Sequence, residues 1–145
     1  MAASDYLENK IAKLIFNNDA AALIGDAAGL QPSAADGDLF IALFEDDPTD
    51  ADVGTESTYT SYARIAVART TGGVAWTITA NVITNTALVT FPTSTGGSST
   101  CTHIGIMTAL VAGELLYHGP LGSSILVETD DIPKFAIGAI SLTLS

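Results

Sequence analysis

The feature that most constrains the fold is a hydrophobic pattern with a period of two that begins near residue 62. In the segment 74–79, Val74, Trp76 and Ile78 alternate with polar or small residues, and Ile65 and Val67 follow the same pattern earlier. Successive side chains of a strand point to opposite faces of a sheet, so this alternation predicts half-buried β-strands. Turn-forming Gly, Pro and Asp residues separate the segments at close spacing, which favours antiparallel sheets over βαβ units.

About seven short strands are expected, and the fold class is therefore mainly β. An antiparallel β-sandwich or a jelly-roll-like barrel fits this pattern. The apolar run 38–44 predicts a buried strand, and the Gly- and Ser-rich segment 93–100 predicts a flexible connection. The further strands are predicted at 62–70, 74–79, 82–91, 101–110, 113–119, 124–128 and 134–144.

The first 18 residues have the helical period instead. Asp5 can cap a helix, Glu8 completes a capping box, and Asn17 with Asn18 can end the helix. A helix of about three turns is marginal alone, so its apolar stripe must be buried on its own domain or on a neighbouring subunit. The stripe supplies our first interface candidates: Leu7, Ile11, Leu14 and Ile15.

An Ala- and Gly-rich arm follows the helix over residues 19–37. Residues 20–24 can form a second short helix, and the rest of the arm is expected to be a loop. We therefore predict two parts, an N-terminal helix and arm over residues 1–37 and an antiparallel β domain over residues 38–145. The arm can reach a neighbouring subunit while the sheet supplies a rigid body.

Charge excludes some partners. Sixteen Asp and Glu against five Lys and Arg give a net charge of −11, which argues against nucleic-acid binding and against an anionic membrane surface. No run approaches the roughly 20 apolar residues of a membrane-spanning helix, so no membrane partner is expected. Arg64 and Arg69 are scarce cations, and we expect each to pair with acids within the chain or across a subunit contact, which makes them interface candidates too.

The densest acidic segment is 45–56. Asp46, Asp47, Asp50 and Asp52 could supply oxygen ligands to calcium, but the spacing is not that of an EF-hand and Pro48 interrupts it. A solvated turn that starts at Asp47 and Pro48 is the favoured interpretation.

No residue pattern indicates catalysis. Cys101 and His103 are two apart on one predicted strand, yet a metal site needs further ligands and a nucleophilic pair needs an orienting group. We interpret Cys101 as a small buried thiol and His103 and His118 as sheet-surface side chains. The chain is therefore expected to have no catalytic residues, no cofactor and no firm metal site, and not to be an enzyme.

The large aromatic residues favour packing over base stacking, because no basic groove accompanies them. We expect them to be core or interface anchors: Tyr59, Tyr62, Trp76 and Tyr117.

Several segments resemble a known family. These are SDYLENK at the start, LFIALFEDDPTDADVGTE leading into SYARIAV, then TNTALVTFPT, THIGIMTA, GELLYHGPL and FAIGAISLTL. In this order they resemble small virion proteins of tailed bacteriophages, described as tail-fibre-like or minor virion structural proteins. The resemblance spans residues 4–144, and the chain departs from it by a longer Ala-rich insert at 18–36.

The resemblance implies a structural role in a virion that is assembled in the bacterial host cytoplasm. We expect a small multi-copy β module of the tail or fibre-attachment region, which acts through self-assembly. Its partners would be other copies of itself, in a homo-oligomer, and other virion proteins. Two alternatives stay open at this point. One is a capsid decoration or cement protein on the phage head, and the other is a carbohydrate-binding β-sandwich that uses Trp76 and the tyrosines on an exposed face.

Overall fold

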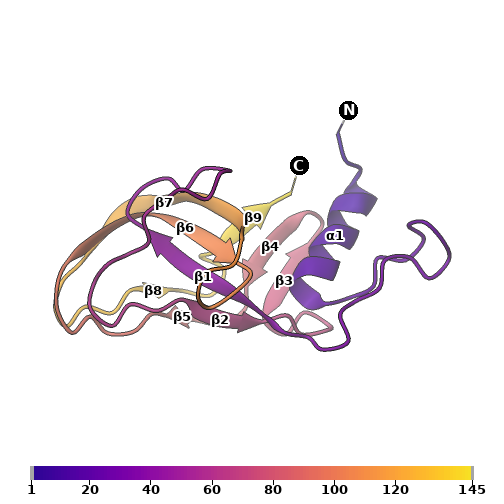
Figure 1. Ribbon diagram of the computed structural model, residues 1–145. Helices are drawn as coiled ribbons and strands as arrows, with labels where there is room; N and C mark the ends of the chain where they lie inside the picture. Colours follow the sequence, from indigo (N-terminus) through magenta and orange to yellow (C-terminus); the bar gives the residue numbers. More distant parts are fainter. Residues whose placement is uncertain (1, 145) are drawn as a thin grey trace. The chain divides into compact units, whose positions relative to one another are not determined.

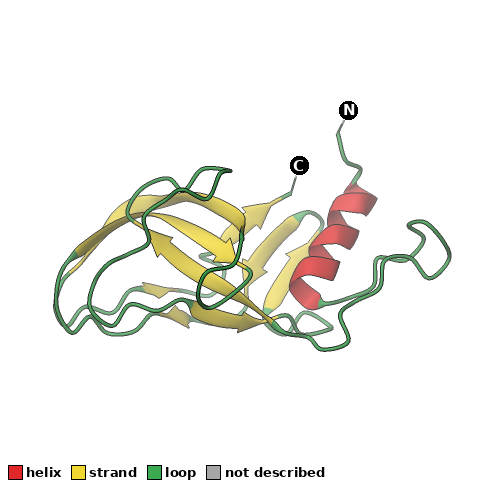
Figure 2. Ribbon diagram, in the orientation of Figure 1, coloured by secondary structure: helices red, strands yellow, loops and turns green. Residues whose placement is uncertain are grey.

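The computed structural model describes residues 2–144, which form one helix and nine strands (Figure 1). Strands dominate and the larger sheets are antiparallel, which confirms the predicted mainly β fold with an N-terminal helix (Figure 2). None of the helical segments within 2–144 is long and apolar enough to cross a membrane. The elements are α1 (Asp5–Asn17), β1 (Asp38–Phe44), β2 (Ile65–Ala68), β3 (Trp76–Thr79), β4 (Val82–Asn85), β5 (Val89–Thr90), β6 (Ser99–Met107), β7 (Leu115–Val127), β8 (Lys134–Phe135) and β9 (Ser141–Thr143).

The chain divides into two compact units. The first contains the residues up to Gly37, the segment Ala68–Val89 and the residues from Phe135 on; the second contains Asp38–Val67 and Thr90–Lys134. The helix and arm thus share a unit with β3, β4 and β9. The division at residue 37 stays a prediction, and a truncation described in the Discussion tests it.

The second unit is built on a four-stranded sheet in the order β2–β1–β6–β7. Strand β1 pairs with β6 from Phe40 opposite Met107 to Phe44 opposite His103. Ile41 to Phe44 are all at most 1% exposed, so both faces of this strand are covered, as the continuous apolar run predicts. Phe44 and Met107 form a core cluster with Ala42.

Two expectations about this sheet are wrong. The segment 93–100 is not a loose linker, because Ser94 is fully buried and β6 begins at Ser99. The predicted strands 113–119 and 124–128 are one strand, β7, which continues through Pro120. Residues 121–124 lie opposite Thr102 alone, so a bulge absorbs the extra chain. Pro120 is tolerated because β7 is an edge strand and its missing N–H need not serve a further strand.

The first unit is a three-stranded sheet, β3–β4–β9, with α1 packed on β3 (Figure 1). The rings of Phe16 and Trp76 meet edge to face at 5.1 Å between centroids. The predicted segments 82–91 and 134–144 are each broken into two strands. Buried Asn85 explains the breaks, because its amide donates to the carbonyls of Ala87 and Ala136 and its oxygen accepts from the N–H of Ile140.

The helix begins one residue earlier than expected. Ser4, not Asp5, is the cap: its hydroxyl accepts a hydrogen bond from the N–H of Leu7. Asp5 lies in the first turn, where its negative charge interacts favourably with the positive end of the helix dipole. The predicted end is confirmed, since Asn18 caps the helix in a left-handed conformation at φ 54°.

The arm forms no second helix at residues 20–24, contrary to the expectation. Ala21 and Leu30 instead pair through two backbone hydrogen bonds of 2.9 and 3.1 Å, which close a protruding loop that we call the finger (residues 21–30; Figure 1). Asp26 accepts from the N–H groups of Ala28 and Gly29. This local turn competes with helix formation, as is common for Asp.

Candidate functional site

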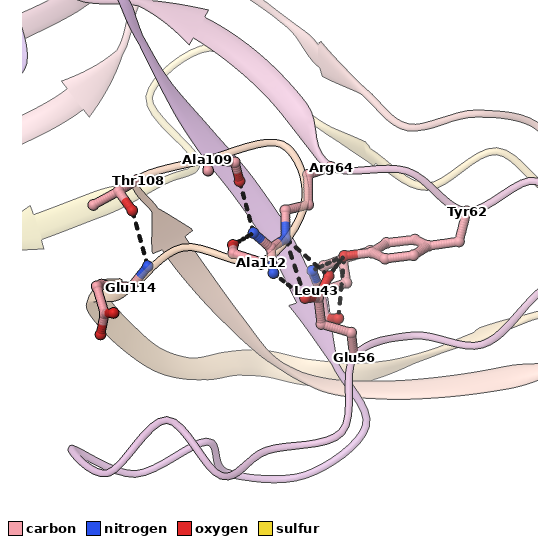
Figure 3. Close-up of polar contacts among 8 residues, drawn as sticks. All are labelled: Leu43, Glu56, Tyr62, Arg64, Thr108, Ala109, Ala112 and Glu114. Carbon is pink, nitrogen blue, oxygen red and sulfur yellow. Dashed lines mark hydrogen bonds and ion pairs between the residues drawn. The ribbon is translucent and has the colours of Figure 1, made fainter.

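The chain places its most deeply buried cation under a surface loop of the second unit. Arg64 directly precedes β2, and its side chain is 8% exposed. Its Nε lies 3.1 Å from both carboxylate oxygens of Glu56, and Nη2 also contacts Oε1 (Figure 3). The expected ion pair of Arg64 is therefore formed within the chain. The contact with Glu56 is the main cause that raises the pKa of Arg64.

The same guanidinium holds the connection between β6 and β7, residues 108–114, which we call the β6–β7 loop. Nη1 donates to the carbonyl oxygens of Ala109, at 2.6 Å, and of Ala112, at 2.5 Å (Figure 3). A planar guanidinium has five N–H donors in fixed directions, so one side chain can fix a carboxylate and two carbonyls together.

The β6–β7 loop is closed at its base as well. The N–H of Thr108 donates to the carbonyl of Glu114 at 3.0 Å, and the N–H of Glu114 donates to Oγ1 of Thr108 at 2.8 Å. Gly113 has φ +81°, and an added Cβ would come within 2.7 Å of Thr108 Oγ1, so glycine is needed there. These contacts restrict the conformation of the loop.

The tip of this loop is apolar and exposed to solvent. Leu110 is 51% exposed and Val111 is 81% exposed. A buried ion pair thus supports a protruding apolar surface. The sequence pattern does not indicate this site, because it predicts a strand through residue 110. The small number of arginines is the one feature of the sequence that could have pointed to this site.

Tyr62 completes what we call the Arg64 cluster, formed by Arg64, Glu56 and Tyr62. Its hydroxyl donates to Oε2 of Glu56 at 2.9 Å and accepts from the N–H of Leu43 at 3.0 Å. Burial is the main cause that raises the pKa of Tyr62. The hydroxyl therefore stays protonated and donates steadily to the carboxylate.

Three of the four helical interface candidates lie on a different side of α1 from its buried residues Ala12 and Phe16. Ala12 and Phe16 are fully buried, whereas Leu7 is 39% exposed. At about 100° per residue, Leu7, Ile11 and Leu14 lie roughly 100–180° around the helix from Ala12 and Phe16. Ile11, Leu14 and Ile15 are partly buried. The predicted stripe therefore exists, but it is not the face that forms the core.

Arg69 has a different set of partners from Arg64. Its guanidinium donates to the carbonyls of Leu14 and Ile15 in the last turn of α1, at 2.8 and 2.5 Å, and to the side-chain oxygen of Asn18. These contacts satisfy carbonyls at the negative end of the helix.

The acidic candidates accept hydrogen bonds within their own turn or lie close to histidines of β6 and β7. Asp46 accepts from the N–H and hydroxyl of Thr55, and Asp47 accepts from the N–H of Thr49. His118 lies with one ring nitrogen 3.2 Å from Asp47 and the other 3.2 Å from Asp50. The negative charge of Asp52 makes a minor contribution to the raised pKa of Arg64.

No group of three or more His, Cys, Asp or Glu side chains within residues 2–144 could hold a metal ion. Cys101 is buried and contacts the hydroxyls of Ser57 and Ser99, whereas His103 contacts Thr102 and lies 4.0 Å from Asp47. A register shift lies opposite Thr102, between Cys101 and His103, and the extra residues are on β7.

The aromatic candidates lie inside the units. Trp76 and Tyr59 are 1% and 2% exposed, Tyr59 donates to the carbonyl of Pro92, and Tyr62 stacks on Phe91. Tyr117 is partly buried. Because Trp76 is buried, it offers no exposed platform for a sugar, and the carbohydrate-binding alternative loses its main residue.

A mainly β fold with an exposed apolar loop tip is compatible with the class of structural proteins that bind other proteins. A family model described as podophage GP4 fiber I protein gp80 matches residues 2–143. The chain belongs to this family, and it is a phage fibre structural protein of the virion. This confirms the resemblance to small tailed-bacteriophage virion proteins, and this class of protein is not an enzyme class. A comparison with curated proteins finds no match.

Proposed function

We propose that the chain is a small multi-copy module of the phage tail or its fibre-attachment region, and that it acts by self-assembly and by contacts with other virion proteins. The observation that carries this proposal is the partly exposed apolar stripe of α1, three of whose four residues lie on a different side of the helix from Ala12 and Phe16. The fibre description of the family favours this location over a decoration role on the head.

A second copy of the chain is the partner that the stripe fits best. Leu7, Ile11 and Leu14 are spaced by four and three residues, which is the spacing of helices that pack side by side. Glu8 lies on one flank of the stripe, and Lys10 and Lys13 lie on the other. In a symmetric parallel contact, the acidic flank of one copy faces the basic flank of the next, so the helix is complementary to itself.

The test is the mass of the purified chain in solution, measured by light scattering. We expect a defined multiple of the chain mass, and we expect Leu7→Gln with Ile11→Gln to reduce it to the single chain. Val74→Gln is the matched control, because Val74 is 71% exposed in the same unit and lies outside the stripe. A wild-type mass of one chain at micromolar concentration, or equal masses for all variants, would contradict assembly through α1.

Location is tested separately. Antibody labelling of purified particles should place the chain at the tail or at the fibre attachment. Label confined to the head surface would instead support the decoration alternative.

A further inference from the structure

We propose that the tip of the β6–β7 loop is a preformed anchor that inserts into an apolar recess with a cationic rim on a different virion protein. This inference rests on the proposed function, because it names one contact by which the module joins its neighbours. It goes beyond the self-contact through α1, since it lies in the other unit and needs another kind of partner.

The loop is held by contacts within the chain itself. Arg64 fixes the carbonyls of Ala109 and Ala112, and Thr108 pairs with Glu114 at the base. A flexible loop would lose conformational freedom on binding, and this entropy cost weakens association. A loop that is already held loses little conformational entropy on binding. More of the free energy gained by burying its exposed side chains is then available for affinity.

The tip has the properties of an anchor. Val111, at 81%, has the highest exposed fraction of the large hydrophobic side chains in the described part of the chain, and Leu110 is exposed beside it. Two side chains are too small an area for a stable complex by themselves. They suit a central pocket that other, weaker contacts surround.

Charge indicates which partner carries the recess. Glu114 lies at the foot of the loop, and its carboxylate points away from the Arg64 cluster (Figure 3). With a net charge of −11, the chain is complementary to a basic surface. A second copy supplies such a surface poorly, because Arg64 and Arg69 are engaged internally and two of the three lysines, Lys10 and Lys13, lie on α1. The partner is therefore a different protein.

The experiment uses phage that lack this chain, propagated in cells that supply wild-type or variant chain. The amount of chain in purified particles is measured by quantitative mass spectrometry. We expect Val111→Asp to lower incorporation at least tenfold, because the recess would have to bury a carboxylate. Val53→Asp is the matched control, since Val53 is 71% exposed in the same unit, and we expect it to be incorporated like the wild type.

Charge is tested with Glu114→Gln and Glu114→Lys. We expect incorporation to fall in that order, and Val111→Ser serves as a second tip variant if Val111→Asp lowers the melting temperature. Equal incorporation of Val111→Asp and Val53→Asp would overturn the proposal. So would a change in the solution mass of Val111→Asp, since the tip would then contact a second copy. Absence of the wild-type chain from particles would refute the proposed function itself.

Discussion

Arg64 holds a surface loop although its own side chain is almost completely buried. Its guanidinium joins a carboxylate on one side to two main-chain carbonyls on the other. None of these groups is close in sequence, since Glu56 precedes Arg64 by eight residues and the loop follows by 45 or more. A single side chain therefore holds two carbonyls of a loop that is distant in sequence.

Replacing Arg64 with Met should destabilise the fold. The substitution leaves the Glu56 carboxylate and two carbonyls without their donor, and breaking a buried pair typically costs about 3–5 kcal/mol. We expect about 2–4 kcal/mol, because Glu56 is 29% exposed and water can solvate it in part. Urea unfolding monitored by circular dichroism measures this loss.

Arg64→Lys is the matched control. Lysine keeps the charge but lacks the planar fork, so it should retain part of the stability while releasing the loop. Hydrogen exchange at the amides of residues 109–113 should rise in both variants. Unchanged stability in Arg64→Met would show that the cluster contributes nothing to the fold.

Residue-level prediction from sequence succeeded where the cause is local. The end of α1 at Asn18 was predictable because a left-handed cap needs only its own residue type. An ion pair for Arg64 was expected because cations are scarce, but the choice of Glu56 depends on tertiary contacts. The loop carbonyls carried no signal, since every residue has a carbonyl group.

At the scale of elements, α1 is held by few but well-packed contacts. Phe16 meets Trp76, and Asn9 donates to the carbonyl of Ala80 at 2.8 Å. Trp76 is the only tryptophan of the chain, so its fluorescence reports directly on the docking of this helix.

Deleting residues 1–37 tests both this docking and the predicted division of the chain. We expect the remaining chain to keep its β signal in circular dichroism, because the four-stranded sheet lies wholly beyond residue 37. The emission of Trp76 should shift to the red, since Phe16 no longer covers the indole.

The control for this deletion replaces residues 22–29 of the finger with a short Gly linker and keeps α1. Its emission should match the wild type. Loss of the β signal in the 1–37 deletion would show that the helix and arm belong to the core, and the division at residue 37 would then be wrong.

Strand positions followed from periodicity, but strand breaks did not. The predicted alternation is seen only over β3, where Trp76 is buried and Thr77 is exposed; Val74 precedes the strand and is 71% exposed. The breaks in 82–91 and 134–144 come from Asn85, whose side chain bonds to residues about fifty positions away. The continuity of β7 was equally hard to predict. Gly119, Pro120 and Gly122 are typical turn residues, and only the edge position of the strand explains why they are tolerated in it.

For the whole molecule, buried phenols make stability depend on alkaline pH. Burial, with a smaller effect of the Cys101 charge, raises the pKa of Tyr59 to about 12 from an ordinary value of 10.0. Burial also raises the pKa values of Tyr62 and Tyr117. The folded state therefore holds these protons more tightly than the unfolded chain. The contribution of the phenols to stability should be constant below about pH 10 and fall above it.

Urea unfolding at pH 8, 10 and 11 measures this fall. Between pH 8 and pH 11 Tyr59 alone should account for about 1.4 kcal/mol of the fall, because pH 11 lies about one unit above its unfolded pKa and one pKa unit corresponds to 1.36 kcal/mol. Tyr59→Phe is the control: it loses the hydrogen bond to Pro92 at all pH values but should show a shallower decline. A decline as steep in Tyr59→Phe as in the wild type would assign the pH dependence to other groups.

At this scale, the fold class and the family were predictable from the sequence, because periodicity and motif order extend over the whole chain. The exposed tip of the β6–β7 loop and the partly exposed position of the α1 stripe were not predictable. Both depend on which side chains the rest of the fold covers. In α1 the fold covers Ala12 and Phe16 and leaves the aliphatic residues of the stripe partly exposed.

The closed base of the finger has a practical consequence for engineering. Because Ala21 and Leu30 hold its two ends together and Asp26 shapes its far side, a foreign peptide could be spliced between Ile24 and Gly25 without straining the rest of the unit. Particles carrying such a graft would display the peptide on every incorporated subunit, as a built-in epitope for imaging or for redirecting the phage.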